Sequence, residues 1–277
     1  MKSVSPERAG TMQHWTIDDS GQLTFGPVRA LDVRIVGGRL AVLASDGPPA
    51  LEIAEITGAP LIVTYDEETG ELSVAYKDLT WDGMLDLIRN KLRRTVATLT
   101  VPKDCQVKAG VVNASAVIAG FENLTSVKSV SGDVVLDGVS GEVSAGTVSG
   151  SVESRAMAGD LSFTSVSGDL TVAQGVPRRL RANSVSGRVT ADLELRPTGH
   201  VTLASVSGDI LVRLPEDVEA DVRLRSTSGR LVSTFEKLSN ESRPGAKSLS
   251  GRLGGGMASL SATTVSGEVA LLKGEKE

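Results

Sequence analysis

The chain has 277 residues, a formal net charge of −5, 40% hydrophobic residues and only 3% aromatic residues. Mild acidity argues against a nucleic-acid-binding protein, which presents a basic face, and no nucleic-acid partner is expected. A single cysteine, Cys105, excludes an internal disulfide, and in an apolar β context it is expected to be an inert small hydrophobe. The length suffices for one long domain or two small ones.

The N-terminal region is expected to be β-structure after a polar, disordered start at residues 1–13. Residues 30–44 contain Gly37–Gly38 between two alternating runs, either as a hairpin-like turn or as a degenerate corner of the repeat described below. Residues 14–95 as a whole are expected to be capping coils for that repeat or, alternatively, a small β domain. Further strands are expected between Gly or Pro breakers at 15–25 (interrupted at 18–21), 51–56, 61–65 and 72–76.

Residues 81–94, WDGMLDLIRNKLRR, predict the one helix of the chain, inserted into the β region. Apolar residues recur three and four positions apart, and acidic residues near the start and basic residues near the end complement the helix dipole. The apolar stripe is expected to pack on β-structure; alternatively it lies on membrane lipid, because tryptophan with a basic end is typical of interfacial helices. The candidate contacts with a partner or a membrane are Trp81, Leu85, Ile88, Arg89, Leu92, Arg93 and Arg94.

Residues 96–272 are dominated by one phrase, Val-Ser-Gly, usually followed by an acid and then an aliphatic residue. The first five phrase glycines lie 9 residues apart, and the next gaps are 19, 21 and 21 residues. A fixed period is typical of a repeat architecture. The repeat-corner glycines are Gly132, Gly141, Gly150, Gly159, Gly168, Gly187, Gly208, Gly229 and Gly267.

Alignment on these glycines predicts two short strands in each repeat. Aliphatic residues stand two positions after every glycine, and apolar residues stand five and seven positions before the later ones, so each strand has one buried face. One coil, meaning one full turn of the chain, then takes about 18–22 residues, with the glycine accepting positive φ at a corner. Stacked coils would form an all-β, β-helix-like solenoid over residues 96–272, followed by a solvated tail at 273–277.

The VSGD and VSGE phrases, with the ending MASLSATTVSGEVALL at 257–272, resemble the bacterial "putative adhesin" family of β-strand-repeat proteins, also called toastrack domains. The N-terminal part resembles actinobacterial members. The resemblance implies a β-solenoid fold of unknown function, and it offers no catalytic residues to transfer.

No catalytic, cofactor-binding or metal-binding constellation is predicted. The only histidines, His14 and His200, are about half the chain apart. Charged residues follow most phrase glycines, but no Gly-Gly-x-Gly-x-Asp series of a calcium-binding roll occurs. Ion pairing between coils on a solvated face is the expected role of these charges.

The sequence therefore predicts a non-enzymatic scaffold that presents a rigid, repetitive face to a protein partner, with end-to-end self-association as a further expectation. Three alternatives stay open: a cell-surface adhesin, a membrane-peripheral scaffold docked by helix 81–94, and a carbohydrate-active β-helix enzyme with paired carboxylates. The sequence shows no signal-peptide pattern and no apolar run of about 18 residues. A cytoplasmic or membrane-peripheral location is accordingly expected.

Overall fold

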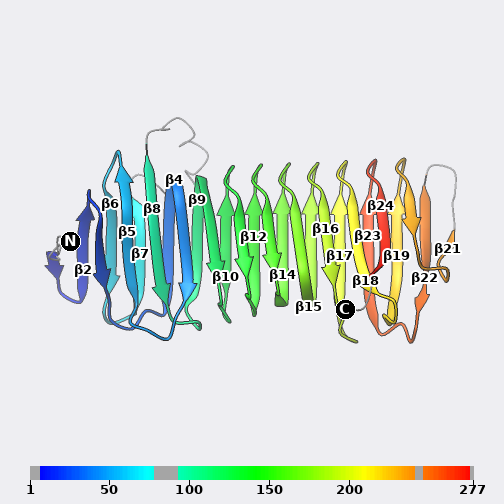
Figure 1. The fold of residues 1–277 in the computed structure, drawn as a ribbon, viewed down its shortest axis with the longest axis horizontal. Helices are drawn as coiled ribbons and strands as arrows, with labels where there is room; N and C mark the ends of the chain where they lie inside the picture. Colours follow the sequence, from blue (N-terminus) through cyan, green and yellow to red (C-terminus); the bar gives the residue numbers. More distant parts are fainter. Residues whose placement is uncertain (1–6, 78–92, 241–245, 275–277) are drawn as a thin grey trace. The chain divides into compact units, whose positions relative to one another are not determined.

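The structure is a computed structural model that describes residues 7–77, 93–240 and 246–274 (Figure 1). These residues form 24 strands and contain no helix. Most of the predicted helix, residues 81–92, lies outside the described residues. Its last two residues are not helical, because Arg93 has no regular structure and Arg94 begins strand β8. The chain divides into two compact units, Met1–Gly141 and Glu142–Glu277, and each is described by itself.

The first unit consists of two hydrogen-bonded ladders. One ladder runs β1-β2-β6-β7-β4-β9-β10, and the other runs β3-β5-β8-β4-β9-β11. The pairings among β1, β2, β6 and β7, and among β3, β5 and β8, are antiparallel, whereas all pairings of β4 and β9 are parallel. The strands are β1 (Glu7–Ala9), β2 (Met12–Ile17), β3 (Gly21–Thr24), β4 (Ala30–Ala44), β5 (Ala50–Thr57), β6 (Leu61–Asp66), β7 (Glu71–Tyr76), β8 (Arg94–Val101), β9 (Gln106–Ala119), β10 (Thr125–Ser129) and β11 (Val134–Asp137).

Strand β1 begins within the segment that was expected to be disordered. It pairs with β2 across a tight turn in which Gly10 has a φ of +68°. The expectation of disorder is therefore wrong for residues 7–13. Behind this turn, Trp15 packs edge-on against Phe25, with ring centroids 5.6 Å apart, and Phe25 also contacts Tyr65. Because of these aromatic rings, the core at the N-terminal end of the unit contains larger side chains than the aliphatic columns of the repeats.

The Gly37–Gly38 pair is a corner of the repeat and not a hairpin turn. Strand β4 runs through it, pairing with β7 before it and with β8 after it. Gly38 also lies opposite Ala114 of β9. Gly132 in turn approaches the carbonyl oxygen of Ala114, so Gly38 and Gly132 belong to one column of corners. Of the two interpretations of this sequence, the degenerate corner is confirmed.

The second unit also consists of two ladders, and these are mainly parallel. The first runs β12-β14-β15-β17-β23-β19 and the second β13-β15-β16-β18-β24-β20. Strands β22 and β21 then add to β19 in antiparallel fashion. The strands are β12 (Glu142–Thr147), β13 (Val152–Arg155), β14 (Ala158–Ser165), β15 (Leu170–Ser184), β16 (Val189–Leu193), β17 (His200–Ser205), β18 (Ile210–Pro215), β19 (Ala220–Ser226), β20 (Leu231–Ser233), β21 (Ser239–Asn240), β22 (Lys247–Leu253), β23 (Ala258–Thr264) and β24 (Val269–Gly274).

The order of the last coils departs from the order of the sequence. Strand β23 pairs with β17 on one side and β19 on the other, and β24 pairs with β18 and β20. The coil at 258–274 therefore lies between the coil at 200–215 and the coil at 220–233. Coils that carry the same phrase can stack in either order, so their order in space does not have to follow the sequence.

The aliphatic columns predicted from the phrase form the core. In the second unit, the residues five and seven positions before the phrase glycines are almost completely buried, and so are those two positions after them, except Leu231, which is only partly buried. Their pairing partners carry the same class of residue, so each column is continuous across the ladder. Representative members of one column are Leu170, Val189, Ile210 and Val269.

Most phrase glycines are required by close backbone approach and not by positive φ. At Gly132, Gly168, Gly187, Gly208, Gly229 and Gly267 an added Cβ would lie 1.8–2.1 Å from a backbone carbonyl oxygen of the adjoining coil. Of the nine, only Gly141 and Gly159 have positive φ, at +82° and +101°. The predicted positive φ is therefore right for these two and wrong for the other seven.

The serines of the phrase hold the corner in two ways. The residue three before the glycine is a buried Ser or Thr whose Oγ accepts the glycine N–H, as in Ser184 with Gly187 at 2.8 Å. The serine directly before the glycine donates its hydroxyl to a carbonyl of the adjoining coil, as Ser186 does to Val166 at 3.2 Å. Both bonds recur at the corners of Gly168, Gly187, Gly208, Gly229 and Gly267.

Replacing Gly187 by Ala should lower the free energy of unfolding by about 2–4 kcal/mol, because its Cβ would meet the Gly168 carbonyl oxygen at 2.0 Å and neither backbone can yield. Gly146→Ala is the matched control, since the nearest atom to its added Cβ is 4.0 Å away. Urea unfolding followed by circular dichroism gives both values. Equal midpoints for the two variants would contradict the close-approach account.

Leu170→Asp should abolish folding of the central coils, because it places a charge in a column where Leu170 is 0% exposed. Thr171→Asp, one residue on and exposed, should change stability by less than about 0.5 kcal/mol. Thermal melting by circular dichroism distinguishes them. An unchanged melting curve for Leu170→Asp would contradict the column assignment.

Candidate interaction surface

The described residues expose a row of valines at the phrase corners of the second unit. We call Val148, Val166, Val185, Val206 and Val265 the valine ridge; each stands two positions before a phrase glycine. They are 38–52% exposed, and they make up five of the seven large hydrophobic residues exposed in the described part of the chain. Exposed apolar side chains are therefore concentrated on one feature, and scattered single ones would need no explanation.

The ridge is held in place by its own backbone. Val185 donates its N–H to Ser165 O at 3.3 Å, and Val206 donates to Ser184 O at 3.2 Å. The serines after Val166, Val185, Val206 and Val265 are bonded to the adjoining coil, and the residue before each ridge valine is a buried Ser or Thr. Because valine also has one strongly preferred side-chain rotamer, the ridge presents methyl groups with little conformational freedom to lose.

The ridge is not among the residues predicted from the sequence, although the phrase contains the signal for it. Positions three, five and seven before the glycine face inward, so alternation places the valine at two before the glycine on the outside. A β-branched apolar residue that recurs at an outward position indicates an exposed apolar ridge.

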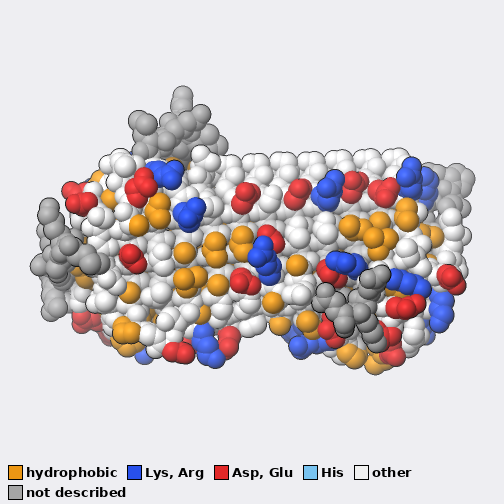
Figure 2. Space-filling model, in the orientation of Figure 1, with side chains coloured by type: hydrophobic (Ala, Val, Ile, Leu, Met, Phe, Trp, Pro, Cys, Tyr) orange, Lys and Arg blue, Asp and Glu red, His pale blue; other side chains and the backbone are white. Residues whose placement is uncertain are grey.

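A row of charges runs beside the ridge. The charge row is Asp169, Arg188, Asp209, Glu268 and Arg230, each directly after a phrase glycine and named here in the order of the ladder. Figure 2 shows acidic and basic side chains in a row along one edge of the face in view. Acidic and basic residues alternate in part of the row, and each charged residue stands three positions after the residue at the ridge position of the same coil.

Two ion pairs join coils within this row. Arg188 lies 4.0 Å from Asp209, and Arg230 lies 3.6 Å from Glu268. The predicted ion pairing between coils is confirmed at these two places. All four side chains are more than 40% exposed, so each pair contributes at most about 1 kcal/mol to stability. Asp209 also accepts the Glu268 N–H at 2.9 Å, and Asp169 of the same row accepts the Arg188 N–H at 2.7 Å. Because the side chains stay exposed, part of their charge is still available to a partner.

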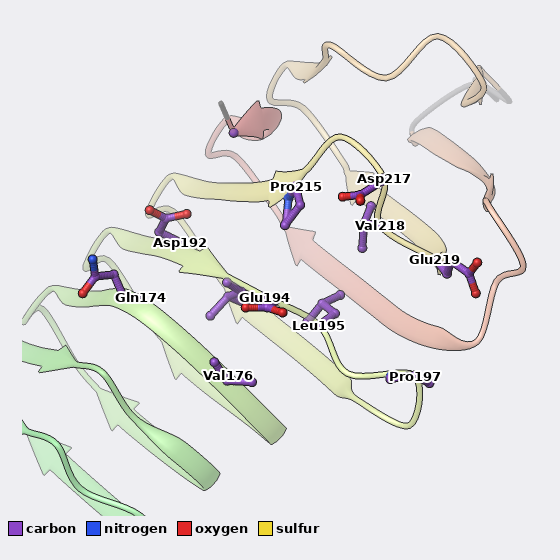
Figure 3. Close-up of a pocket in the computed structure, with 12 residues that line it drawn as sticks. Gln174, Val176, Asp192, Glu194, Leu195, Pro197, Pro215, Asp217, Val218 and Glu219 are labelled. Carbon is purple, nitrogen blue, oxygen red and sulfur yellow. The ribbon is translucent and has the colours of Figure 1, made fainter. Parts of the chain in front are cut away.

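A pocket of about 780 Å³ opens elsewhere on the second unit, beside the segments that follow β16 and β18 (Figure 3). Val176, Leu195 and Val218 supply apolar surface to it. Its carboxylates are Asp192, Glu194, Asp217 and Glu219. Asp192 is already paired with Arg213 at 2.9 Å, and Figure 3 shows Glu219 on the opposite side of the view from Asp192. The pocket is acidic and favours cations.

The structure also places the remaining sequence candidates. Cys105 is buried, and burial raises the pKa of its thiol to about 12, with a smaller contribution from the Asp104 carboxylate. His200 lies at the start of β17, where its Nδ1 is 2.8 Å from Ser259 Oγ. Within the described residues, no His, Cys, Asp or Glu cluster could hold a metal ion. The same residues contain no helix that could cross a membrane.

Two of the candidate contact residues of the predicted helix make contacts within the first unit. The Arg93 guanidinium lies 5.0 Å from the centre of the Tyr76 ring, and Arg94 lies 3.2 Å from Glu55. These arginines therefore have roles in the described β structure. The others, Trp81, Leu85, Ile88, Arg89 and Leu92, lie outside the described residues.

Val185→Ser combined with Val206→Ser should change the free energy of unfolding by less than about 1 kcal/mol, because both side chains are about half exposed. Val189→Ser, at a fully buried position, is the matched control and should cost about 2–3 kcal/mol. Urea midpoints measure both. A large loss in the double ridge variant would mean that the ridge serves the fold.

Comparison with known proteins adds the family. A family model described as Toastrack DUF4097 matches residues 63–272. No curated protein gives a significant match. Similar solved structures include a "putative adhesin" from Parabacteroides distasonis ATCC 8503 (12% identity, TM-score 0.42, 92% of this chain and 96% of that one). Two others are a "putative lipid binding protein" from the same strain (13%, 0.39, 96% and 98%) and a "putative cell adhesion protein" from Clostridium sporogenes ATCC 15579 (10%, 0.29, 92% and 99%).

These identities and TM-scores carry no argument about function. The family match covers most of the chain, including every phrase from Gly132 to Gly267. It agrees with the all-β ladders and with the resemblance seen in the VSGD and VSGE phrases. The chain belongs to the Toastrack DUF4097 family.

Proposed function

We propose that this chain is a non-enzymatic β-scaffold that docks a protein partner on the valine ridge. The observation that carries the proposal is the ridge itself: five half-exposed valines in successive coils, anchored by backbone hydrogen bonds. Burying the exposed part of one such valine contributes roughly 1 kcal/mol. A contact along several coils would add these small terms, while the flanking charges select the partner.

The same pairings support a finer proposal about architecture. We interpret the parallel ladders of the second unit, with partners 18 to 21 residues apart between β13 and β18, as a β-solenoid. In the first unit, the antiparallel strands at the ends of both ladders would then act as capping coils. This arrangement would protect the apolar edges that an uncapped stack exposes. A rigid stack is the scaffold that the proposed ridge requires.

The absence of enzymatic activity is part of this proposal. A glycosidase needs two carboxyl groups flanking the scissile bond. In the acidic pocket, Asp192 is engaged by Arg213, and Glu219 lies across the view from it. Glu194 and Asp217 also line the pocket, so it keeps carboxylates for the carbohydrate-active alternative, and the scaffold proposal rests on the valine ridge and not on the pocket.

Site-specific photocrosslinking in cells tests the docking proposal. A benzoylphenylalanine at position 185 should give a discrete adduct with a protein, whereas the same group at exposed position 171 should not. Adding Val166→Ser and Val206→Ser should reduce the adduct at 185 severalfold, because it removes apolar contact on both sides. No adduct at 185, or equal adducts at 185 and 171, would overturn the proposed function.

A further inference from the structure

We infer that a second copy of this chain docks on the valine ridge, antiparallel to the first, with the twofold axis at Asp209. This inference rests on the proposed function and names the partner. Its basis is the order of signs along the charge row, which only the structure reveals. In the ladder the row reads acid, base, acid, acid, base, because Glu268 stands between Asp209 and Arg230.

An antiparallel pair about Asp209 brings opposite charges together. Asp169 then faces Arg230 of the second copy, and Arg188 faces Glu268 of the second copy. The twofold axis repeats both contacts, which gives four attractive positions. Only Asp209 faces itself, and the Arg188 guanidinium of the same chain lies 4.0 Å from it, which offsets part of that repulsion.

The neighbouring antiparallel registers are less favourable. Moving the axis halfway toward Arg188 places Arg188 against Asp209, which attract, but it also places Asp169 against Glu268, two acids, so two attractive positions are offset by two repulsive ones. Moving it halfway toward Glu268 places Arg188 against Arg230 and Asp209 against Glu268, which are all like-charge contacts. Like charges that face each other destabilise an interface. The charge row therefore selects one antiparallel register among its neighbours.

A parallel pair does not use the charge row. A twofold axis along the ridge exchanges the two sides of the ridge, so the charge row of each copy faces the other side of its partner. That side carries the outward residues four positions before the phrase glycines, which are Thr164, Asn183, Ala204, Thr263 and Arg225. The first four are uncharged, and Arg225 belongs to the same coil as Arg230 and would face it as a like charge, so parallel packing lacks the complementary charges of the antiparallel one.

The ridge fits the selected register. Val206 meets Val206 at the axis, and Val185 meets Val265 of the second copy. Val166 meets Thr227, which holds the ridge position in the outermost coil and donates its N–H to Thr264 O at 3.3 Å. Every contact on the ridge is then between β-branched side chains that carry methyl groups. Such a contact is smaller than a stable standard interface, so the dimer should be weak and concentration-dependent.

Cysteine crosslinking tests the register, in a chain whose native thiol is first removed by Cys105→Ala. Val206→Cys should form a disulfide-linked dimer on mild oxidation, because that position faces itself. Val166→Cys and Thr227→Cys should each crosslink poorly alone but well when mixed, with one copy carrying a mass tag to identify the mixed dimer. Thr171→Cys, exposed and away from the ridge, measures random collision. We expect at least a tenfold rate difference over that control.

Each outcome bears on the inference. Equal crosslinking of Val166→Cys, Thr227→Cys and Val206→Cys with themselves would mean parallel packing and would overturn it. Rates equal to the Thr171→Cys control throughout would mean that the chain does not self-associate at the ridge. If photocrosslinking at 185 still gives an adduct with another protein, the proposed function survives while self-association fails.

A charge exchange gives a second readout that does not depend on disulfide geometry. Asp169→Arg or Arg230→Asp alone should each weaken dimerisation roughly fivefold in analytical ultracentrifugation, because each creates two like-charge contacts. The double variant should restore it. Failure of the double variant to recover, with both singles folded by circular dichroism, would overturn the register.

Discussion

The structure depends on how closely successive coils approach at the phrase glycines. With carbonyl oxygens about 2 Å from where a Cβ would be, no side chain fits there. At Gly187 the tight approach also brings the hydroxyls of Ser184 and Ser186, on either side of Val185, within reach of backbone groups. The valine side chain has no polar group to bond there and points outward. The exposed ridge is a consequence of the corner.

The repeat itself was readable from the sequence because its period and its buried columns depend on local alternation. Leu170, Val189 and Ile210 could be assigned to one column from their distance to a glycine alone, and the structure confirms them as buried. The sequence predicted that the phrase glycines adopt positive φ, which is wrong at most corners. The close approach between coils that requires a glycine there is a property of two segments and cannot be inferred from one. The same holds for the N-terminal strand β1, whose pairing stabilises residues that look polar and unstructured in isolation.

The order of the coils could not be predicted, because it is not a local property. Each phrase is an equally good neighbour for any other, so the sequence contains no signal that favours β24 over β20 as the partner of β18. What distinguishes them is the excursion through β21 and β22, which pairs antiparallel outside β19 and returns the chain to the gap. The same holds for the candidate interaction surface. The order of acidic and basic residues along the charge row depends on the order of the coils, so its self-complementarity cannot be seen in the sequence.

The intercalated coil has a consequence for how the protein is made. During synthesis, residues 142–215 can stack in the order in which they emerge from the ribosome. The coil at 220–233 cannot take its final place at that stage, because the strands that separate it from β18 are translated later. At about 5–20 residues per second, it waits a few seconds with an apolar face uncovered, unless it first stacks on the wrong neighbour and is later displaced. The final coil therefore acts as the closing piece of the unit, and the time before its arrival is when the nascent chain is most open to misassembly.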